Sequence, residues 1–336
     1  MLIDIMNRQC IGHEVFLIII NRENNPELLQ KIDSRVDIRI IGRKRHTYNP
    51  LPVVRFNTVL RRIAPDIVHM HNPHIMPLLF RKWRDCRFVF TAHTTTGIMQ
   101  AGRFHKIFAI SHSVQEYLWQ RYGKSTPVQV IYNGIDTQAI AHRAKGEAPG
   151  KMFRIIQVGR LAHRQKGQDI TLEALHILTE KYGVSSVSVD FIGEGASMDF
   201  LSEKAREYHI ENRVSFLGNR DRSYIYDHLH EYDLLVQPSR VEGFGLTVAE
   251  GIAAGVPVLV SDVAGPMEII EQGKWGTSFA QDNAADCAEK IHYILSRYAE
   301  VSEKAEAAAK AIRKFDISLT ASNYINAYAE LIGRRE

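Results

Sequence analysis

Short apolar segments alternate along the whole chain with stretches in which apolar residues recur every three to four positions. Segments such as Ile67–His71 and Phe153–Val158 are rich in β-branched residues and have the length of a buried strand. The stretch Gln168–Tyr182 repeats its apolar residues with the period of a helix that buries one face. Strands that alternate with helices in this way form parallel sheets covered by helices. The pattern therefore predicts an α/β protein.

The alternation runs through two blocks of the chain. In the first block, helices are expected over Leu51–Arg62 and over Ser113–Tyr122, with Ser111 or Ser113 as the N-cap of the second. The strands expected there are Glu14–Ile20, Val36–Ile41, Ile67–His71, Arg87–Ala92, Lys106–Ile110 and Val128–Tyr132. In the second block, the expected strands are Phe153–Val158, Val187–Ile192, Val214–Leu217, Leu234–Gln237 and Val256–Ser261. The helices expected there are Gln168–Tyr182, Met198–Tyr208, Ala284–Ser296, Ser302–Lys314 and Leu319–Ile332.

A polar stretch, Ala141–Lys151, separates the two blocks. It contains Gly146, Pro149 and Gly150, which suit a connection better than a regular element. At 336 residues, the chain is long enough for two α/β domains of ordinary size. We therefore expect this stretch to be the interdomain linker.

The segment Glu242–Pro257 reads EGFGLTVAEGIAAGVP and contains the clearest candidate chemistry. It follows a predicted strand, and a turn with Gly243 and Gly245 opens a helix of small residues. The free N–H groups and positive dipole end of such a helix hold anionic oxygen, and glycine lets the backbone approach a ligand closely. Glu242 before the turn and Glu250 on the helix can bind hydroxyls. The segment predicts a site for a sugar, a diphosphate and a ribose.

A second candidate group follows the predicted strand Phe153–Val158. Arg160 and Lys166 place two cations in the loop between this strand and the next helix. Ligands of parallel-sheet proteins bind at such strand ends. Two positive charges there can neutralise a nucleotide diphosphate and stabilise it as it departs with growing negative charge.

These two segments resemble the motifs of a known enzyme family. Gln157–Leu161 with Lys166 and Gly167 resembles the GRL…KG motif, and Glu242–Glu250 the E-x7-E motif, of the retaining glycosyltransferases of family 4. The resemblance runs from about Gly12 to Leu331. It implies the GT-B fold, in which two Rossmann-like domains face each other across a cleft. We expect an acceptor-side domain over residues 1–147, completed by a C-terminal helix over 317–336, and a donor-binding domain over 148–316.

The resemblance also implies an activity. Members transfer a sugar from a nucleotide-diphosphate donor to a glycan or lipid-linked glycan acceptor with retention of configuration, here in cell-surface polysaccharide or lipopolysaccharide synthesis. The leaving diphosphate helps to deprotonate the acceptor. No cofactor and no metal are expected, because Arg160, Lys166 and the helix after Gly245 supply the positive charge. The resemblance assigns Glu242 to the sugar hydroxyls and Glu250 to the ribose.

Further site residues come from the same comparison of motifs. Asp66–His71 resembles the family's D-[IV]-[IV]-H-x-H segment, and Thr91–His93 resembles a T-x-H segment whose histidine lies close to the transferred sugar. The expected catalytic residues are His93, Glu242, Arg160 and Lys166. The expected substrate-binding residues are Glu250, Gly243, Phe244, Gly245, Leu246, Thr247, Gly193, Gly195, Leu217, Asn219 and His71.

The first residues depart from the family pattern. Family members open with a strand and a glycine-rich loop, and then a helix leads into GHEV. Here GHEV is Gly12–Val15, and Met1–Ile11 is similar to the end of that helix. We therefore expect the first domain to be shortened, without the first strand and its loop. This departure leaves two alternatives: the start of the sequence has been assigned too late, or the chain is a truncated, inactive transferase.

Charge is distributed unevenly. Residues 1–150 contain 21 Lys and Arg against 11 Asp and Glu, a net charge of +10, whereas the whole chain carries +4. A basic half attracts anionic surfaces, and we expect peripheral contact with anionic membrane. Nucleic acid is not expected, since no binding motif accompanies the charge. Cys10, Cys86 and Cys287 have no disulfide or metal spacing, and no signal peptide is recognised, so a cytoplasmic location is expected.

Two alternatives to a transferase stay open. A nucleotide-sugar 2-epimerase shares the two-domain architecture, but its chemistry needs acid and base carboxylates in the first domain, and no convincing set is present. A non-catalytic nucleotide-sugar-binding subunit is favoured by the shortened first domain. Binding without turnover distinguishes this second alternative from a transferase.

Overall fold

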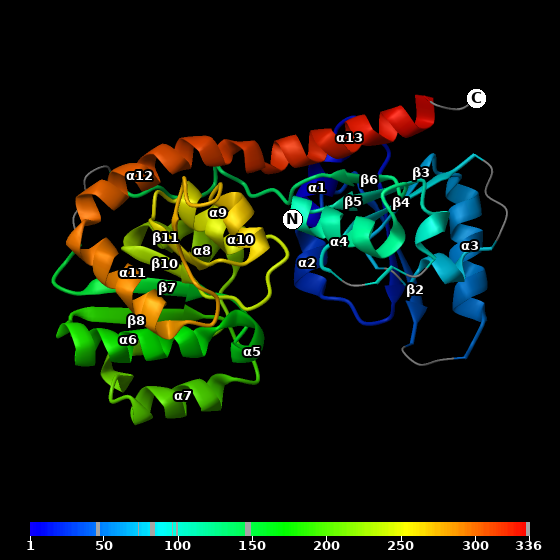
Figure 1. Ribbon diagram of the computed structural model, residues 1–336. Helices are drawn as coiled ribbons and strands as arrows, with labels where there is room; N and C mark the ends of the chain where they lie inside the picture. The colour runs from blue at the N-terminus through cyan, green and yellow to red at the C-terminus, as the bar shows by residue number, and fades with distance from the viewer. Residues whose placement is uncertain are drawn as a thin grey trace. The chain divides into compact units, whose positions relative to one another are not determined.

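The computed structural model shows an α/β protein of two compact units (Figure 1). It describes residues 1–44, 48–72, 74–80, 85–95, 97–98, 100–144 and 149–333. One unit comprises Met1–Gly134 and Ile317–Glu336, and the other Ile135–Asp316. The chain thus divides at Gly134, whereas the expected boundary between residues 147 and 148 lies outside the described residues.

The first unit contains two parallel sheets. Its strands are β1 (Phe16–Asn21), β2 (Asp37–Arg43), β3 (Ile67–Met70), β4 (Arg87–Ala92), β5 (Lys106–Ala109) and β6 (Val128–Val130). Its helices are α1 (Leu2–Gln9), α2 (Pro26–Gln30), α3 (Leu51–Ile63), α4 (His112–Tyr122), α13 (Ile317–Gly333) and the short 3-10 turns Met76–Leu78 and Ala101–Arg103. Ser111 caps α4 through a hydrogen bond from the Val114 amide, as the sequence predicts. Each strand expected in this block is present within a few residues of its predicted ends.

The two sheets of this unit are not joined to each other. Among the described residues, β1 pairs only with β2, and β3 pairs only with β4, so each has one open edge. The run Phe16–Ile20 is apolar at every position, which is typical of a strand buried on both faces, yet all five side chains are only half-buried. The strand β1 is therefore less covered than its apolar sequence predicts.

Helices α1 and α13 cover the sheets of the first unit. Ile5 of α1 and Tyr324 of α13 pack in one cluster with Val89 and Phe108 of the four-stranded sheet. Met6 of α1 packs in a second cluster, with side chains around β1 and β2. The expected last helix therefore belongs to the first unit, and α1 contacts both sheets.

The second unit contains one parallel sheet with the order β12-β11-β10-β7-β8-β9, and Figure 1 shows β11, β10, β7 and β8 side by side. The strands are β7 (Phe153–Val158), β8 (Val187–Ile192), β9 (Val214–Phe216), β10 (Leu234–Gln237), β11 (Val258–Ser261) and β12 (Thr277–Phe279). The helices are α5 (His163–Lys166), α6 (Gln168–Tyr182), α7 (Met198–Glu207), α8 (Arg222–His228), α9 (Leu246–Ala253), α10 (Ala264–Ile269), α11 (Ala284–Ser296), α12 (Tyr298–Ala311) and the 3-10 turns Glu211–Arg213, Leu229–Glu231 and Ile312–Phe315. Leu175 of α6 and Ile291 of α11 are fully buried in the cluster that packs on this sheet.

Candidate functional site

The sheet order of the second unit brings the two main candidate segments together. The chain proceeds from β7 to β8 and β9 on one side and later adds β10, β11 and β12 on the other. The direction in which the chain adds successive strands therefore reverses between the neighbouring strands β7 and β10. Ligands of open parallel sheets bind at the carboxyl ends of the strands at such a switch point. The loop that contains Arg160 and Lys166 follows β7, and the turn that contains Glu242 follows β10.

Lys166 and Glu242 are in direct contact at this edge. The Lys166 Nζ lies 2.6 Å from the Glu242 Oε2, and both side chains are about four-fifths buried. The side chains of Gln237 and Ser239 approach the same carboxylate oxygen, at 3.3 and 3.5 Å. The Lys166 ammonium group and the Glu242 carboxylate are thus held next to each other. A carboxylate can accept hydrogen bonds from the hydroxyls of a ligand.

Two buried glutamines hold the loops around this pair. The sequence analysis named Gln157 only as the start of a motif segment and assigned no role to either glutamine. The Gln157 side chain donates to the Lys166 carbonyl at 2.9 Å and accepts from the Thr171 hydroxyl. Gln237, the last residue of β10, accepts from the Thr247 hydroxyl at 3.0 Å. The signal for both is a polar residue in the last two positions of a mainly apolar strand.

Arg240 joins the two loops and was also missed. Its guanidinium donates two parallel hydrogen bonds of 2.9 Å to Asp169 and one of 2.8 Å to Asp282. It also donates to the His163 carbonyl at 2.7 Å, and its backbone N–H donates to the Gln165 carbonyl. The hydrogen-bonded Asp169 carboxylate raises the pKa of Arg240 above its ordinary value. These contacts fix the turn after β10 against the loop after β7.

Arg160 is exposed at the same edge. Its guanidinium donates to the Gln165 side chain at 2.8 Å, and its carbonyl accepts from Gln168 at 2.9 Å. The backbone is therefore held while the charged group faces solvent, where an anion can reach it.

The glycine turn forms the start of α9. Gly245 has φ +102°, a left-handed conformation that favours glycine, and it is the N-cap of the helix. The first backbone hydrogen bonds of this helix run from the amides of Val248 and Ala249 to the Gly245 carbonyl. Within the described part of the chain, the preceding amides of Leu246 and Thr247 make no backbone hydrogen bond. These two amides can donate to a phosphate or a sugar.

The ring of Phe244 is buried and packs edge-on against Phe315, with ring centroids 5.4 Å apart. Its side chain anchors the turn, so a contact with substrate falls to its backbone. Gly243 lies in the same tight turn: a Cβ on Gly265 of α10 would lie 2.9 Å from the Gly243 carbonyl carbon and 2.7 Å from the Glu242 carbonyl oxygen.

Glu250 lies one turn into α9 and is half-buried. Burial raises the pKa of this carboxyl to about 7, although the charge of Arg222 acts in the opposite direction. A carboxyl with this pKa gains or loses its proton near neutral pH, so its capacity to accept hydrogen bonds as a carboxylate depends on pH.

The loops after β8 and β9 meet the loop after β7. A Cβ on Gly193 would lie 2.1 Å from the Gly159 carbonyl oxygen, and one on Gly195 would lie 2.3 Å from the Leu161 carbonyl oxygen. These glycines therefore permit backbone packing between the loops. Leu217 is half-buried, and Asn219 is exposed.

His71 and His93 belong to the first unit and follow β3 and β4. The His71 Nδ1 and the His93 Nε2 are 3.0 Å apart, and the rings stack with centroids separated by 5.3 Å. Burial lowers the pKa of His71 to about 3 and also lowers the pKa of His93. Both rings are therefore neutral at pH 7. The contact uses the Nε2 atom of His93, so its Nδ1 atom can bind a ligand.

The described residues contain no group of three or more side chains with metal-ligating chemistry. None of the described helices is long and apolar enough to span a bilayer.

Comparisons with known proteins agree with this architecture. A family model described as glycosyl transferases group 1 matches residues 138–315, and one described as glycosyltransferase family 4 matches residues 11–139. The glycogen synthase of Mycobacterium tuberculosis is 27% identical over 270 residues, a match that covers 74% of this chain and 64% of that relative. The chain thus spans less than two thirds of that relative's length.

Two solved structures have the same fold. A glycosyltransferase from Rickettsia africae ESF-5 superposes with a TM-score of 0.81 at 20% identity, covering 99% of this chain and 94% of that one. HepE from Anabaena, solved in complex with UDP and glucose, superposes with a TM-score of 0.79 at 18% identity. This match covers 98% of this chain and 95% of the HepE chain. The predicted GT-B type of fold is confirmed. Because the group 1 model matches more than half of the sequence, this chain belongs to the group 1 glycosyl transferases, with a family 4 match over its first part.

Proposed function

We propose that this protein transfers a sugar from a nucleotide-diphosphate donor to a glycan or lipid-linked glycan acceptor, with retention of configuration at the anomeric carbon. The observation that carries the proposal is the contact between Lys166 and Glu242 at the switch point of the donor-side sheet, next to the start of α9. A cation, two unbonded amides and a carboxylate together suit a diphosphate joined to a polyol.

In the proposed reaction, the bond between the anomeric carbon and the diphosphate oxygen breaks, and the acceptor oxygen bonds to the same face of the sugar. The acceptor proton passes to the departing diphosphate. Arg160, Lys166 and the amides of Leu246 and Thr247 stabilise the negative charge that develops on the diphosphate. These groups supply positive charge from the chain itself, so we propose that no metal is needed.

We assign the roles of Glu242, Glu250 and His93 from the chemistry of their side chains and from the motifs that contain them. Glu242 accepts hydrogen bonds from the sugar hydroxyls, and Glu250 from the ribose. We assign to His93 a hydrogen bond to a hydroxyl of the transferred sugar, for which its neutral ring offers Nδ1.

None of the three cysteines forms a disulfide, which supports a reducing cytoplasmic location.

A panel of nucleotide sugars tests the proposal. The purified protein is incubated with each donor, nucleotide release is measured, and the anomeric configuration of the product is determined by NMR. Release of one nucleotide with a retained configuration supports the proposal, whereas inversion refutes the retaining mechanism.

The open edges of β1 and β3 favour a second candidate, a non-catalytic subunit that binds nucleotide sugars. Tight binding of a donor without turnover, in the presence of acceptor extracts, would favour that candidate.

A further inference from the structure

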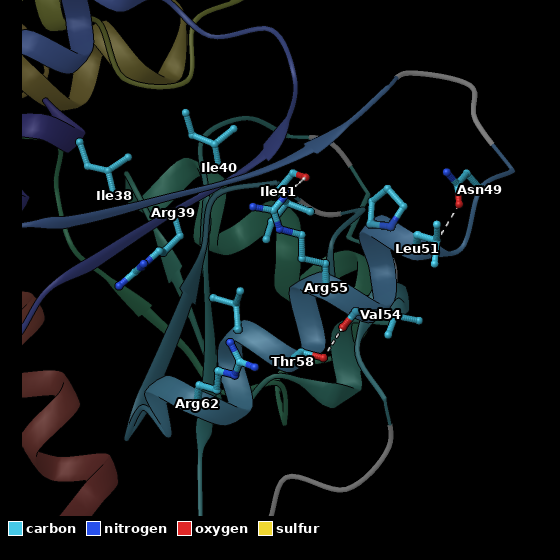
Figure 2. Close-up of a pocket in the computed structure, with 12 residues that line it drawn as sticks. Ile38, Arg39, Ile40, Ile41, Asn49, Leu51, Val54, Arg55, Thr58 and Arg62 are labelled. Carbon is cyan, nitrogen blue, oxygen red and sulfur yellow. Dashed lines mark hydrogen bonds between the residues drawn. The ribbon is translucent and has the colours of Figure 1, made fainter.

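A groove lies between β2 and α3 of the first unit and contains none of the residues assigned above (Figure 2). Its volume is about 780 Å³. Ile38 and Ile40 of β2 line it together with Leu51 and Val54 of α3. Because β2 pairs only with β1 among the described residues, the groove follows an edge strand.

Several apolar side chains of this groove are exposed. The exposed fraction is 68% for Leu51 and 47% for Val54, both on α3. Ile40 is 40% exposed, but its side chain points away from α3, on the opposite side of β2 from Ile41 (Figure 2). Isolated exposed aliphatic residues are ordinary, but a group of them along one groove marks a surface that another apolar body covers.

Three arginines line the same groove, and no acidic residue does so among its described lining. Arg39 forms an ion pair of 2.6 Å with Asp37, and Arg55 donates a long hydrogen bond to the Ile41 carbonyl. Arg62 has no ion pair or hydrogen bond with any residue that the structure describes. Figure 2 shows Arg55 and Arg62 on α3. The groove thus combines aliphatic side chains with an excess of positive charge.

We propose that this groove docks the protein on an anionic lipid bilayer. The aliphatic side chains of Leu51 and Val54 enter the boundary between headgroups and acyl chains, and the guanidinium groups of Arg55 and Arg62 bind lipid phosphates. A soluble phosphate could bind the arginines, but it would leave the side chains of Leu51 and Val54 in water. The inference rests on the proposed function in one respect: docking gives the enzyme access to a lipid-linked acceptor.

Sedimentation with vesicles tests the groove. Vesicles of phosphatidylcholine alone are compared with vesicles of phosphatidylcholine and phosphatidylglycerol. We expect binding to the anionic vesicles only, weakened by added salt. Arg62→Gln should lower the partition coefficient about fivefold, and Arg55→Gln with Arg62→Gln about 25-fold. The matched control is Arg61→Gln, on the same helix but outside the groove lining, which should change it less than twofold.

The apolar component needs its own variants. Val54→Ser should weaken vesicle binding, whereas Leu28→Ser, at an exposed position of α2 outside the groove, should not. Equal binding to neutral and anionic vesicles would overturn the proposal, as would equal losses for Arg61→Gln and Arg62→Gln. If Val54→Ser binds like the wild type and inorganic phosphate displaces the protein, the groove is an anion site and not a membrane surface.

Nucleotide binding by each variant is measured in parallel. These substitutions lie in the first unit, so the variants should bind nucleotide like the wild type. Vesicle binding that is lost while nucleotide binding stays intact reports on the groove alone. Absence of nucleotide binding in every form, including the wild type, would instead refute the proposed function.

Discussion

Replacing Lys166 with alanine is expected to impair catalysis far more than stability. About one fifth of each side chain in the ion pair with Glu242 is exposed, so its loss should lower the free energy of unfolding by about 1–2 kcal/mol, between the values for an exposed and a fully buried pair. In the variant, the Glu242 carboxylate keeps the side chains of Gln237 and Ser239 as neighbours. By contrast, removal of one group that stabilises developing negative charge in a transition state typically lowers kcat by roughly 10²–10³-fold, or about 3–4 kcal/mol.

The assay is nucleotide release from the active donor under saturating conditions, with the free energy of unfolding measured in urea. Arg164→Ala is the matched control, because Arg164 is an exposed cation on the same short helix, α5. We expect kcat to fall about 100-fold or more for Lys166→Ala and to change less than twofold for Arg164→Ala. Equal effects of the two substitutions on kcat would refute the assigned role of Lys166, since general loss of positive charge would then explain both.

Three further predictions concern other side chains. Because burial raises the pKa of Glu250 to about 7, nucleotide affinity should fall as the pH is lowered from 8 to 6, by at most about tenfold per unit, and Glu250→Gln should remove this dependence in calorimetric titrations. Arg240→Ala should raise KM for the donor and lower kcat, with partial rescue by Arg240→Lys, whereas no kinetic change in either variant would exclude a positioning role. Arg143→Ala should destabilise the second unit by about 3 kcal/mol in urea unfolding, because it leaves the buried Asp233 without its cation. The matched control Arg154→Ala removes an ion pair with Asp190 in which Arg154 is exposed, and it should cost about 1 kcal/mol or less.

Much of the fold was predictable because buried strands and amphipathic helices have distinct apolar periods. The strand Phe153–Val158 and the helices Gln168–Tyr182 and Ala284–Ser296 have the bounds that the sequence predicts. The division of the chain was harder to predict. Arg143 lies in the expected linker, but it is buried and hydrogen-bonded to Asp233. A polar composition does not reveal such a contact between distant residues.

The candidate site was predictable only in part, for a related reason. The spacing of Glu242 and Glu250, and the cations after β7, could be recognised from their local motifs. Arg240 could not, because its role depends on which strands are neighbours in the sheet, and no periodic pattern encodes strand order. The burial of the Phe244 ring could not be recognised from its motif either, because it depends on packing against the distant Phe315.

The most direct test of the central claim is calorimetric titration of the protein with UDP, GDP and ADP and with the matching nucleosides. We expect one diphosphate to bind at least about 100-fold more tightly than its nucleoside, since charge-assisted hydrogen bonds from cations and amides recognise the phosphates. This advantage should largely disappear in the Arg160→Ala and Lys166→Ala double variant. If no diphosphate binds more tightly than its nucleoside, the carboxyl ends of the strands in the second unit's sheet do not form a diphosphate site.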